Sequence, residues 1–284
     1  MILITGGTGA VGSELVKILL ARGAKVRVMV RNPDKAAGLG GSGVELAKGD
    51  FADPASMESA MRGCERAFLL PPVDQGMVAA QEAFIDAVKR AGVRHVVKLS
   101  AVGARLGAPH RFGDWHGRGE EYLKKSGVGW TMLRPSFFMQ NWLTMAEMVK
   151  AGTIYLPCGE GKAPFVDVRD IAAVAAGALA SEGHGGKVYD VTGPAALGYA
   201  EVAAIFSRVL GRAVKYVDVP AEAAKQSMMG AGMPEWLAEG INELNAEMKA
   251  GSFSRVTSVV REVGGKEAVT AEQFIRENAK AFGG

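Results

Sequence analysis

Short apolar runs alternate with longer segments of helical period through the first half of the chain. Leu15, Ile18 and Leu19 recur at three- and four-residue steps, which indicates a helix with one buried face. Runs of near-continuous apolar character are typical of parallel strands covered on both faces. The predicted strands are Ile2–Thr5, Lys25–Val30, Val44–Ala47, Ala67–Leu70, His95–Leu99 and Trp130–Leu133, and the predicted helices are Ala10–Arg22, Pro54–Met61, Met77–Ala91 and Gly113–Lys125. Right-handed crossovers make a Rossmann-type, doubly wound α/β sheet the expected fold.

The pattern changes after about residue 150, where glycine and proline punctuate a loop-rich stretch. The further predicted elements are helices Arg169–Ser181, Tyr199–Leu210, Pro234–Met248 and Ala271–Phe282 and strands Lys187–Val191 and Val214–Val219. We therefore expect residues 1–150, completed by 165–192, to form the sheet domain. Residues 193–284 and 151–164 are expected to form a smaller, mainly helical lobe on the strand ends.

Composition narrows the class of protein. The 284 residues are 48% hydrophobic and 22% charged, which excludes a disordered chain, a collagen-like repeat and a disulfide scaffold. The net charge of +3 is spread along the chain, so no nucleic-acid partner is expected. Cys64 and Cys158 lack the spacing of a metal site or a disulfide framework and are predicted to be buried free thiols.

No membrane partner is expected either. The longest apolar stretch, Ile171 to Ala180, falls short of the roughly 20 residues that a membrane-spanning helix needs. The chain begins directly with an apolar strand and shows no signal-peptide pattern, so a cytoplasmic location is predicted.

The strongest local motif follows the first predicted strand. Gly6, Gly9 and Gly12 match GxxGxxG, and Gly7 with the last two also matches GxGxxG. Such glycines permit a tight turn, approach of the backbone to a pyrophosphate and close packing of helix on strand, although a purely structural turn is the alternative. The phosphate would lie at the N-terminus of the helix. The predicted cofactor-binding residues here are Gly6, Thr8, Gly9, Ala10, Val11 and Gly12.

The end of the second strand distinguishes between two cofactors. An acidic residue is expected there for NAD(H), but the sequence has Arg31, followed by Lys35. Two cations suit a 2′-phosphate, so NADP(H) is favoured over NAD(H). A solvated basic turn, with Asp34 paired to Lys35, is the alternative.

An ordered set of motifs resembles the NmrA-like family of atypical short-chain dehydrogenase/reductases over nearly the whole chain. Within that family the resemblance is to NADPH-dependent quinone and triphenylmethane-dye reductases. Beyond the glycine motif, the resemblance is carried by residues 31–35, 49–56, 97–100, 116–127, 131–141, 165–172 and 189–194.

The resemblance implies further cofactor-binding positions. Asp50 and Phe51 are expected beside the adenine, and Leu70 and Pro71 near the following ribose. The positions expected toward the nicotinamide are Ser100, Ala101, Pro135, Ser136 and Phe137. The residues alone leave other interpretations open. Asp50 also suits a turn or helix cap before Pro54, and Phe137 and Phe138 also suit core packing.

The sequence departs from ordinary short-chain dehydrogenases at the helix that carries their Tyr-xxx-Lys pair. Phe112 and His116 occupy the two positions, and a phenyl ring cannot donate a proton. His116 is therefore the candidate catalytic proton donor. The alternative is a structural pair between His116 and Glu120 at i,i+4.

A quinone or similar conjugated small molecule is the predicted hydride acceptor, because it delocalises the incoming charge. Trp115, Phe138, Asn141 and Trp142 are the candidate acceptor-binding residues. Arg134, Asp167 and Asp170 are expected to hold the loops after the sixth strand, a role that Asn141 also suits. A non-catalytic, NAD(P)-binding redox sensor that binds a partner protein is the alternative function. No metal is predicted, and the sequence leaves monomer and homodimer open.

Overall fold

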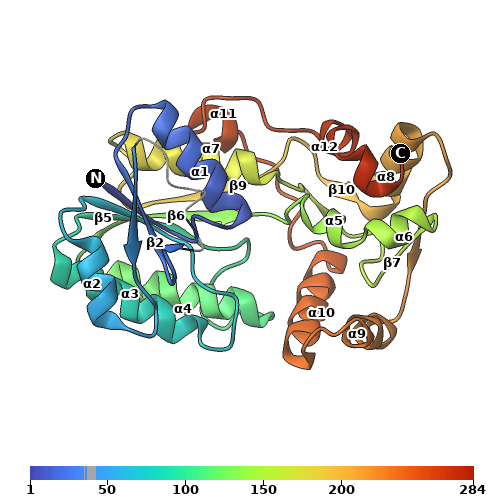
Figure 1. The fold of residues 1–284 in the computed structure, drawn as a ribbon. Helices are drawn as coiled ribbons and strands as arrows, with labels where there is room; N and C mark the ends of the chain where they lie inside the picture. Colours follow the sequence, from blue (N-terminus) through green and yellow to red (C-terminus); the bar gives the residue numbers. More distant parts are fainter. Residues whose placement is uncertain (35, 37–42) are drawn as a thin grey trace.

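Seven parallel strands form one central sheet in the computed structural model, which describes residues 1–34, 36 and 43–284 (Figure 1). In spatial order the strands are β3 (Val44–Lys48), β2 (Val26–Val30), β1 (Ile2–Thr5), β4 (Arg66–Leu69), β5 (His95–Leu99), β6 (Gly129–Pro135) and β9 (Lys187–Val191). The strand order reverses between β1 and β4, and ligands of open α/β sheets bind at the carboxyl ends of strands at such a point. The predicted doubly wound sheet is confirmed.

The two faces of the sheet carry separate cores, because successive side chains of a strand point in opposite directions. Ile2 and Ile4 enter one core and Leu3, between them, enters the other. The first face is covered by α1 (Ala10–Ala21), α7 (Val168–Ala180) and α11 (Val259–Glu262), and the second by α2 (Pro54–Met61), α3 (Met77–Ala91) and α4 (Arg111–Lys125). The side on which a strand residue lies therefore decides which helices it can contact.

A third core fills the smaller lobe at the other end of the molecule (Figure 1). The lobe elements are α5 (Asn141–Thr144), α6 (Ala146–Lys150), β7 (Thr153–Leu156), β8 (Lys162–Ala163), β10 (Leu197–Gly198), α8 (Tyr199–Leu210), β11 (Lys215–Asp218), α9 (Ala221–Gly230), α10 (Glu235–Lys249), α12 (Ala271–Glu277) and a 3₁₀ helix at Ala279–Phe282. Trp142 is fully buried in this core, with ring centroids 5.1 Å from Phe165 and 5.7 Å from Phe274. Lobe side chains enclose the indole, so Trp142 contributes to this core, and its contact with the acceptor stays a prediction.

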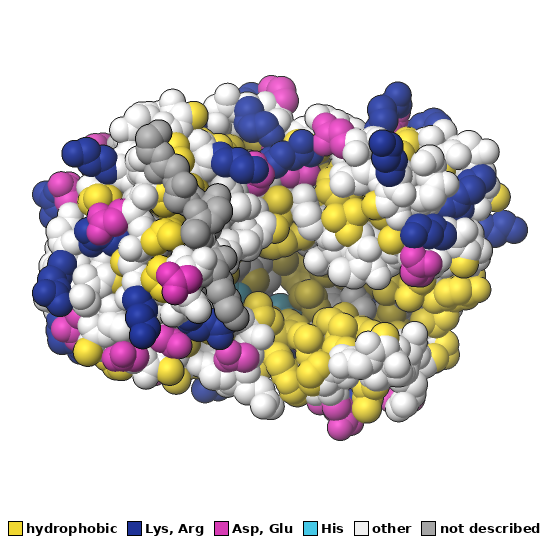
Figure 2. Space-filling model, in the orientation of Figure 1, with side chains coloured by type: hydrophobic (Ala, Val, Ile, Leu, Met, Phe, Trp, Pro, Cys, Tyr) yellow, Lys and Arg dark blue, Asp and Glu magenta, His cyan; other side chains and the backbone are white. Residues whose placement is uncertain are grey.

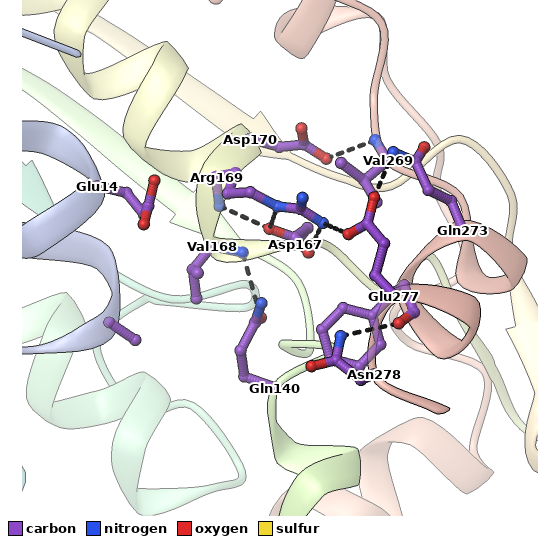
Figure 3. Close-up of polar contacts among 12 residues, drawn as sticks. Glu14, Gln140, Asp167, Val168, Arg169, Asp170, Val269, Gln273, Glu277 and Asn278 are labelled. Atoms are coloured by element: carbon purple, nitrogen blue, oxygen red, sulfur yellow. Dashed lines mark hydrogen bonds and ion pairs between the residues drawn. The ribbon is translucent and has the colours of Figure 1, made fainter. Parts of the chain in front are cut away.

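Polar contacts join the start of α7 to the lobe (Figure 3). Asp167 caps α7 by accepting from the backbone N–H of Arg169, and it also accepts from the Arg169 guanidinium. That guanidinium reaches Glu277 of α12 at 2.7 Å. Asp170 accepts from the backbone N–H of Val269 at 2.8 Å. The structural role predicted for Asp167 and Asp170 is confirmed.

The predicted elements of the sheet domain are present, whereas several in the lobe differ. The stretch expected to be a loop at 151–164 contains β7 and β8. β7 was missed because its partner, β11, lies about sixty residues later in the chain. The helix expected at Ala271–Phe282 is divided at Asn278, whose side-chain amide donates to the carbonyl of Phe274 and ends α12. The short helices α5, α6 and α11 and the helix α9 were not predicted individually.

Cys64 and Cys158 are free and buried in different cores, as predicted, and burial raises the pKa of both thiols. Within the described residues, no helix is both long and apolar enough to cross a membrane. The same residues contain no group of three or more histidine, cysteine or acidic side chains arranged to hold a metal ion.

Trp142→Ala should lower the free energy of unfolding by about 3–5 kcal/mol, because it opens a cavity among closely packed aromatic rings. Trp115→Ala is the matched control, since Trp115 is only partly buried, and it should cost clearly less. Urea unfolding followed by circular dichroism measures both variants. Equal losses in the two variants would contradict the central place of Trp142 in the lobe core.

Candidate functional site

The predicted cofactor-binding residues follow the ends of six neighbouring strands. Because all pairings in the sheet are parallel, these ends lie along the same edge. In the order of the sheet the predicted positions are Asp50 and Phe51 after β3, Arg31 after β2, Gly6 to Gly12 after β1, Leu70 and Pro71 after β4, Ser100 and Ala101 after β5, and Pro135 to Phe137 at the end of β6. The fold therefore brings these positions to one edge of the sheet.

The glycine loop leaves the N-terminus of α1 open. Gly12 packs so closely on the loop that a Cβ there would lie 2.1 Å from the carbonyl oxygen of Gly6, and Gly6 itself has a φ of 66°. Gly9 is exposed, and a Cβ on it would meet only the Gly6 oxygen, at 3.3 Å. As the N-cap of α1, Gly9 has no side chain to cap the first N–H groups, and the first turn carries no acidic residue. This geometry fits a bound phosphate.

The candidate 2′-phosphate residue Arg31 is exposed directly after β2. It forms no ion pair or hydrogen bond with the residues that the structure describes, so its guanidinium is available to an anion. Lys35, the second predicted cation, lies outside the described residues.

Local contacts hold the loops after β3 and β4 at this edge. The Asp50 carboxylate accepts from the N–H of Ala52, and Asp53, rather than Asp50, is the N-cap of α2. The ring of Phe51 packs on Phe84 at 5.8 Å between centroids. After β4, Leu70 packs against Gly6 of the glycine loop, and Pro71 is buried.

A buried carboxylate links β5, β6 and α4. Glu120 is 1% exposed and accepts 2.6 Å from the hydroxyl of Ser100. Its two oxygens also accept from the guanidinium of Arg134, at 2.9 and 2.5 Å. Burying a carboxylate without partners is costly, and here three charge-assisted bonds offset that cost. Glu120 and Arg134 therefore fix the start of the loop after β5 against the helix that carries His116.

His116 is paired with a buried lysine of the sheet. Lys98 is fully buried in β5, and its Nζ lies 3.1 Å from Nδ1 of His116. Lys98 follows Val96 on the face of the sheet that α4 covers, which explains why its side chain reaches this helix. The i,i+4 pair of His116 with Glu120, which was the structural alternative, is absent, because His116 bonds to Lys98 and Glu120 bonds to Ser100 and Arg134.

Burial sets the protonation of this pair. Desolvation lowers the pKa of Lys98 to about 7, with Glu120 opposing and Arg134 adding to the shift. Desolvation, together with Lys98 and His110, holds the pKa of His116 well below its ordinary value. The imidazole is therefore neutral near neutral pH.

An apolar hollow lies between the sheet domain and the lobe, with a histidine side chain visible inside it (Figure 2). Phe112, which the sequence reasoning assigned to the tyrosine position, packs on α10, where a Cβ at Gly240 would lie 2.7 Å from its ring. Trp115 packs on Phe112 and Trp236. It lines a second, open hollow of about 530 Å³ between α4 and α10, together with charged residues such as Arg118 and Glu243.

The two adjacent phenylalanines face different cores. Phe138 packs against the sheet core, whereas Phe137 packs against the lobe core, 5.7 Å from the ring of Phe253. A cofactor contact of Phe137 and an acceptor contact of Phe138 stay predictions. Ser136 between them is 4% exposed, and its hydroxyl has no partner among the described residues, which suits a contact with a ligand. Asn141 is exposed at the start of α5.

Comparison with known proteins identifies the family. The model of the NmrA-like family matches residues 1–268. The chain belongs to the NmrA-like family. It is 42% identical over 284 residues to an NAD(P)H azoreductase of Xenophilus azovorans, covering 100% of this chain and 99% of the relative. It is 36% identical over 289 residues to a (4-alkanoyl-5-oxo-2,5-dihydrofuran-3-yl)methyl phosphate reductase of Streptomyces griseus, covering 99% of each.

A solved structure of the same shape is the NADPH-dependent quinone oxidoreductase 2 of Escherichia coli in complex with NADPH. It superposes with a TM-score of 0.92 at 27% identity, covering 98% of this chain and 99% of that protein. The resemblance to the NmrA-like family that the sequence motifs indicated is confirmed over residues 1–268.

In this NmrA-like chain, the sequence reasoning missed the role of Lys98. The only local signal is a lysine inside the apolar run Val96-Val97-Lys98-Leu99. A lysine is rarely fully buried unless it is paired, so a charge at a sheet-core position can be flagged from sequence. Its partner His116, eighteen residues later, becomes visible only in the fold.

Lys98→Met should stabilise this NmrA-like protein at low pH. The pKa of Lys98 is about 7 in the folded protein and 10.5 in an unfolded chain. Between these two pH values the unfolded chain therefore binds one proton more than the folded protein. The stability of the wild type therefore rises across this window, and the full cost of the buried charge is present below pH 7. At about pH 6 the variant should be more stable by about 1–3 kcal/mol, and this advantage should shrink as the pH rises toward 10.

Urea unfolding at several pH values measures the difference. Lys89→Met, at an exposed lysine near the end of α3, is the matched control and should show no such pH dependence. A Lys98→Met advantage that stays constant from pH 6 to pH 10 would contradict the lowered pKa.

Proposed function

We propose that this protein is an NAD(P)H-dependent oxidoreductase, favouring NADP(H), that reduces a quinone or a similar conjugated small molecule. The observation that carries the proposal is an open, glycine-rich helix N-terminus on the same strand edge as a neutral imidazole held by a buried lysine. Two relatives, the azoreductase and the quinone oxidoreductase, are named for nicotinamide-dependent reduction of conjugated acceptors.

The residues at the strand edge fit the cofactor. The open N–H groups after Gly9 suit the pyrophosphate, the free guanidinium of Arg31 suits a 2′-phosphate, and the unpartnered hydroxyl of Ser136 suits a contact near the nicotinamide. When bound, NADPH supplies the hydride. The chain itself orients the two reactants and supplies the proton.

The division of labour follows the three cores except at α5 and α6, which pack in the lobe core, and at α11, which packs on the sheet. We assign cofactor binding to residues 1–150 with 165–192, and cover of the acceptor to residues 193–284 with 151–164. The apolar hollow between the two parts suits a flat acceptor (Figure 2).

We propose that the reaction proceeds without a tyrosine acid. Phe112 is turned toward α10, so no hydroxyl at the tyrosine position stabilises the localised alkoxide that a ketone forms as it accepts hydride. A quinone spreads the incoming charge over its ring and second oxygen, and positioning then supplies most of the barrier reduction. His116 is the proposed proton donor to the reduced acceptor.

Arg31→Ala should weaken NADPH binding much more than NADH binding, by about 1.5–3 kcal/mol, because a charge-assisted contact with the 2′-phosphate is lost. Fluorescence titration with each cofactor measures the two dissociation constants. Arg94→Ala is the matched control, because Arg94 is an exposed arginine at the opposite edge of the sheet, before β5. Equal weakening of both cofactors by Arg31→Ala, or a wild type that prefers NADH, would contradict this assignment.

The wild-type protein should oxidise NADPH with quinones and azo dyes and should show little activity with simple ketones. Absorbance of NADPH against a panel of acceptors measures this directly. Efficient ketone reduction would contradict the mechanism. Tight NADPH binding without turnover of any conjugated acceptor would instead favour the NAD(P)-binding redox sensor.

A further inference from the structure

We infer that Lys98 is the internal proton source for His116, forming a two-residue relay that delivers a proton to acceptors that need one after hydride transfer. The inference rests on the proposed reductase function and deepens it. Lys98 does not contact the acceptor and is a positioning and proton-supplying residue behind the catalytic imidazole.

The geometry fixes the direction of the hydrogen bond. An ammonium group has no acceptor, so the contact of 3.1 Å makes Nδ1 of His116 the acceptor whenever Lys98 is charged. The imidazole must then carry its own proton on Nε2. The second contact of Lys98 Nζ, with the carbonyl of Leu99, is long at 3.5 Å, so His116 is the main partner.

The imidazole is held in this orientation by its helix. A Cβ at Gly117 would lie 2.3 Å from the backbone of Arg105, so α4 packs directly on the loop after β5. The N–H of Arg105 also donates to the carbonyl of Gly113 at 3.2 Å. Both contacts hold α4 against the loop that follows the strand of Lys98.

A neutral histidine needs such a source. Its low pKa means that His116 holds no extra proton at neutral pH, and a neutral imidazole is a very weak acid. It can give up the Nε2 proton only if Nδ1 gains one in the same step. Lys98, with a pKa of about 7, is matched to supply that proton.

The charged groups around the pair leave Lys98 able to change its protonation. Glu120 of α4 favours the ammonium, and Arg134 of β6 disfavours it. Glu120 is already engaged by Ser100 and Arg134, and no carboxylate of the described residues forms an ion pair with Lys98. On the imidazole side, His110 at the start of α4 is the other titratable neighbour.

The proposed step balances. Hydride transfer to a quinone leaves a hydroquinone monoanion, whose oxygen takes the proton from Nε2 of His116. Nδ1 takes a proton from the Lys98 ammonium, so that the products are a neutral hydroquinone, a neutral imidazole and a neutral amine. A proton from water then returns to Nε2, and the Nδ1 proton returns to Lys98.

Turnover of two kinds of acceptor distinguishes a proton relay from a purely structural role of Lys98. A quinone needs one proton after hydride transfer, whereas a triarylmethyl dye cation accepts hydride and becomes neutral without a proton. Lys98→Met removes both the charge and the proton. Lys98→Arg keeps a charged donor but does not release a proton near neutral pH. Lys89→Met, on the exposed end of α3, is the control.

Both Lys98 variants should slow quinone turnover by roughly 10- to 100-fold, and dye turnover should change less than about threefold. The kcat for the quinone should fall above about pH 7 in the wild type, as Lys98 loses its proton, and this fall should be absent in Lys98→Arg. Equal losses on both acceptors, or full quinone activity in Lys98→Arg, would overturn the relay. If the dye is not turned over, the pH profile for the quinone decides.

The tautomer of His116 gives a readout that does not depend on activity. Nitrogen-15 NMR of the imidazole in the protein without cofactor should show the proton on Nε2 in the wild type, and should lose this preference in Lys98→Met. A wild-type imidazole protonated on Nδ1 would overturn the inference. A wild type that reduces no conjugated acceptor would instead refute the proposed reductase function.

Discussion

The bond network of one buried carboxylate fixes the arrangement of the site. Glu120 joins α4 to the ends of β5 and β6 through Ser100 and Arg134. An unpaired carboxylate at this depth would be strongly unfavourable, so the three elements that contribute to the network cannot shift independently. The position of His116, one helical turn before Glu120, follows from this restraint.

A second ionisable side chain, that of Lys98, lies beside this network but takes no part in its bonds. Lys98 contributes no ion pair within the described part of the chain, and its burial lowers its pKa. Such a residue opposes folding at acidic and neutral pH, where an apolar side chain of similar length would fill the same space. Strand residues on either side of Lys98 are apolar and buried, so the fold itself does not require a charge here.

The sequence predicts the sheet domain well because its signals are local. Each strand is a short apolar run, and the glycine spacing after β1 reports a turn that a side chain at Gly12 would block. The lobe is predicted less well, since β7 depends on β11, which is distant in the chain. Helical spacing suggested a pair between His116 and Glu120, but sheet residues compete for both side chains. The opposite directions of Phe137 and Phe138 depend on the junction between two cores, which no local pattern describes.

The packing of α1 on α7 has a consequence for how the chain is made. α1 is complete at Ala21, but the helix that lies beside it over the same sheet face ends at Ala180. During synthesis, Ile2, Ile4 and their neighbours on that face therefore stay incompletely covered until nearly two thirds of the protein has left the ribosome. An apolar sheet surface open for so long favours association with other chains. The nascent protein therefore most needs a chaperone during the time between the synthesis of α1 and the synthesis of α7.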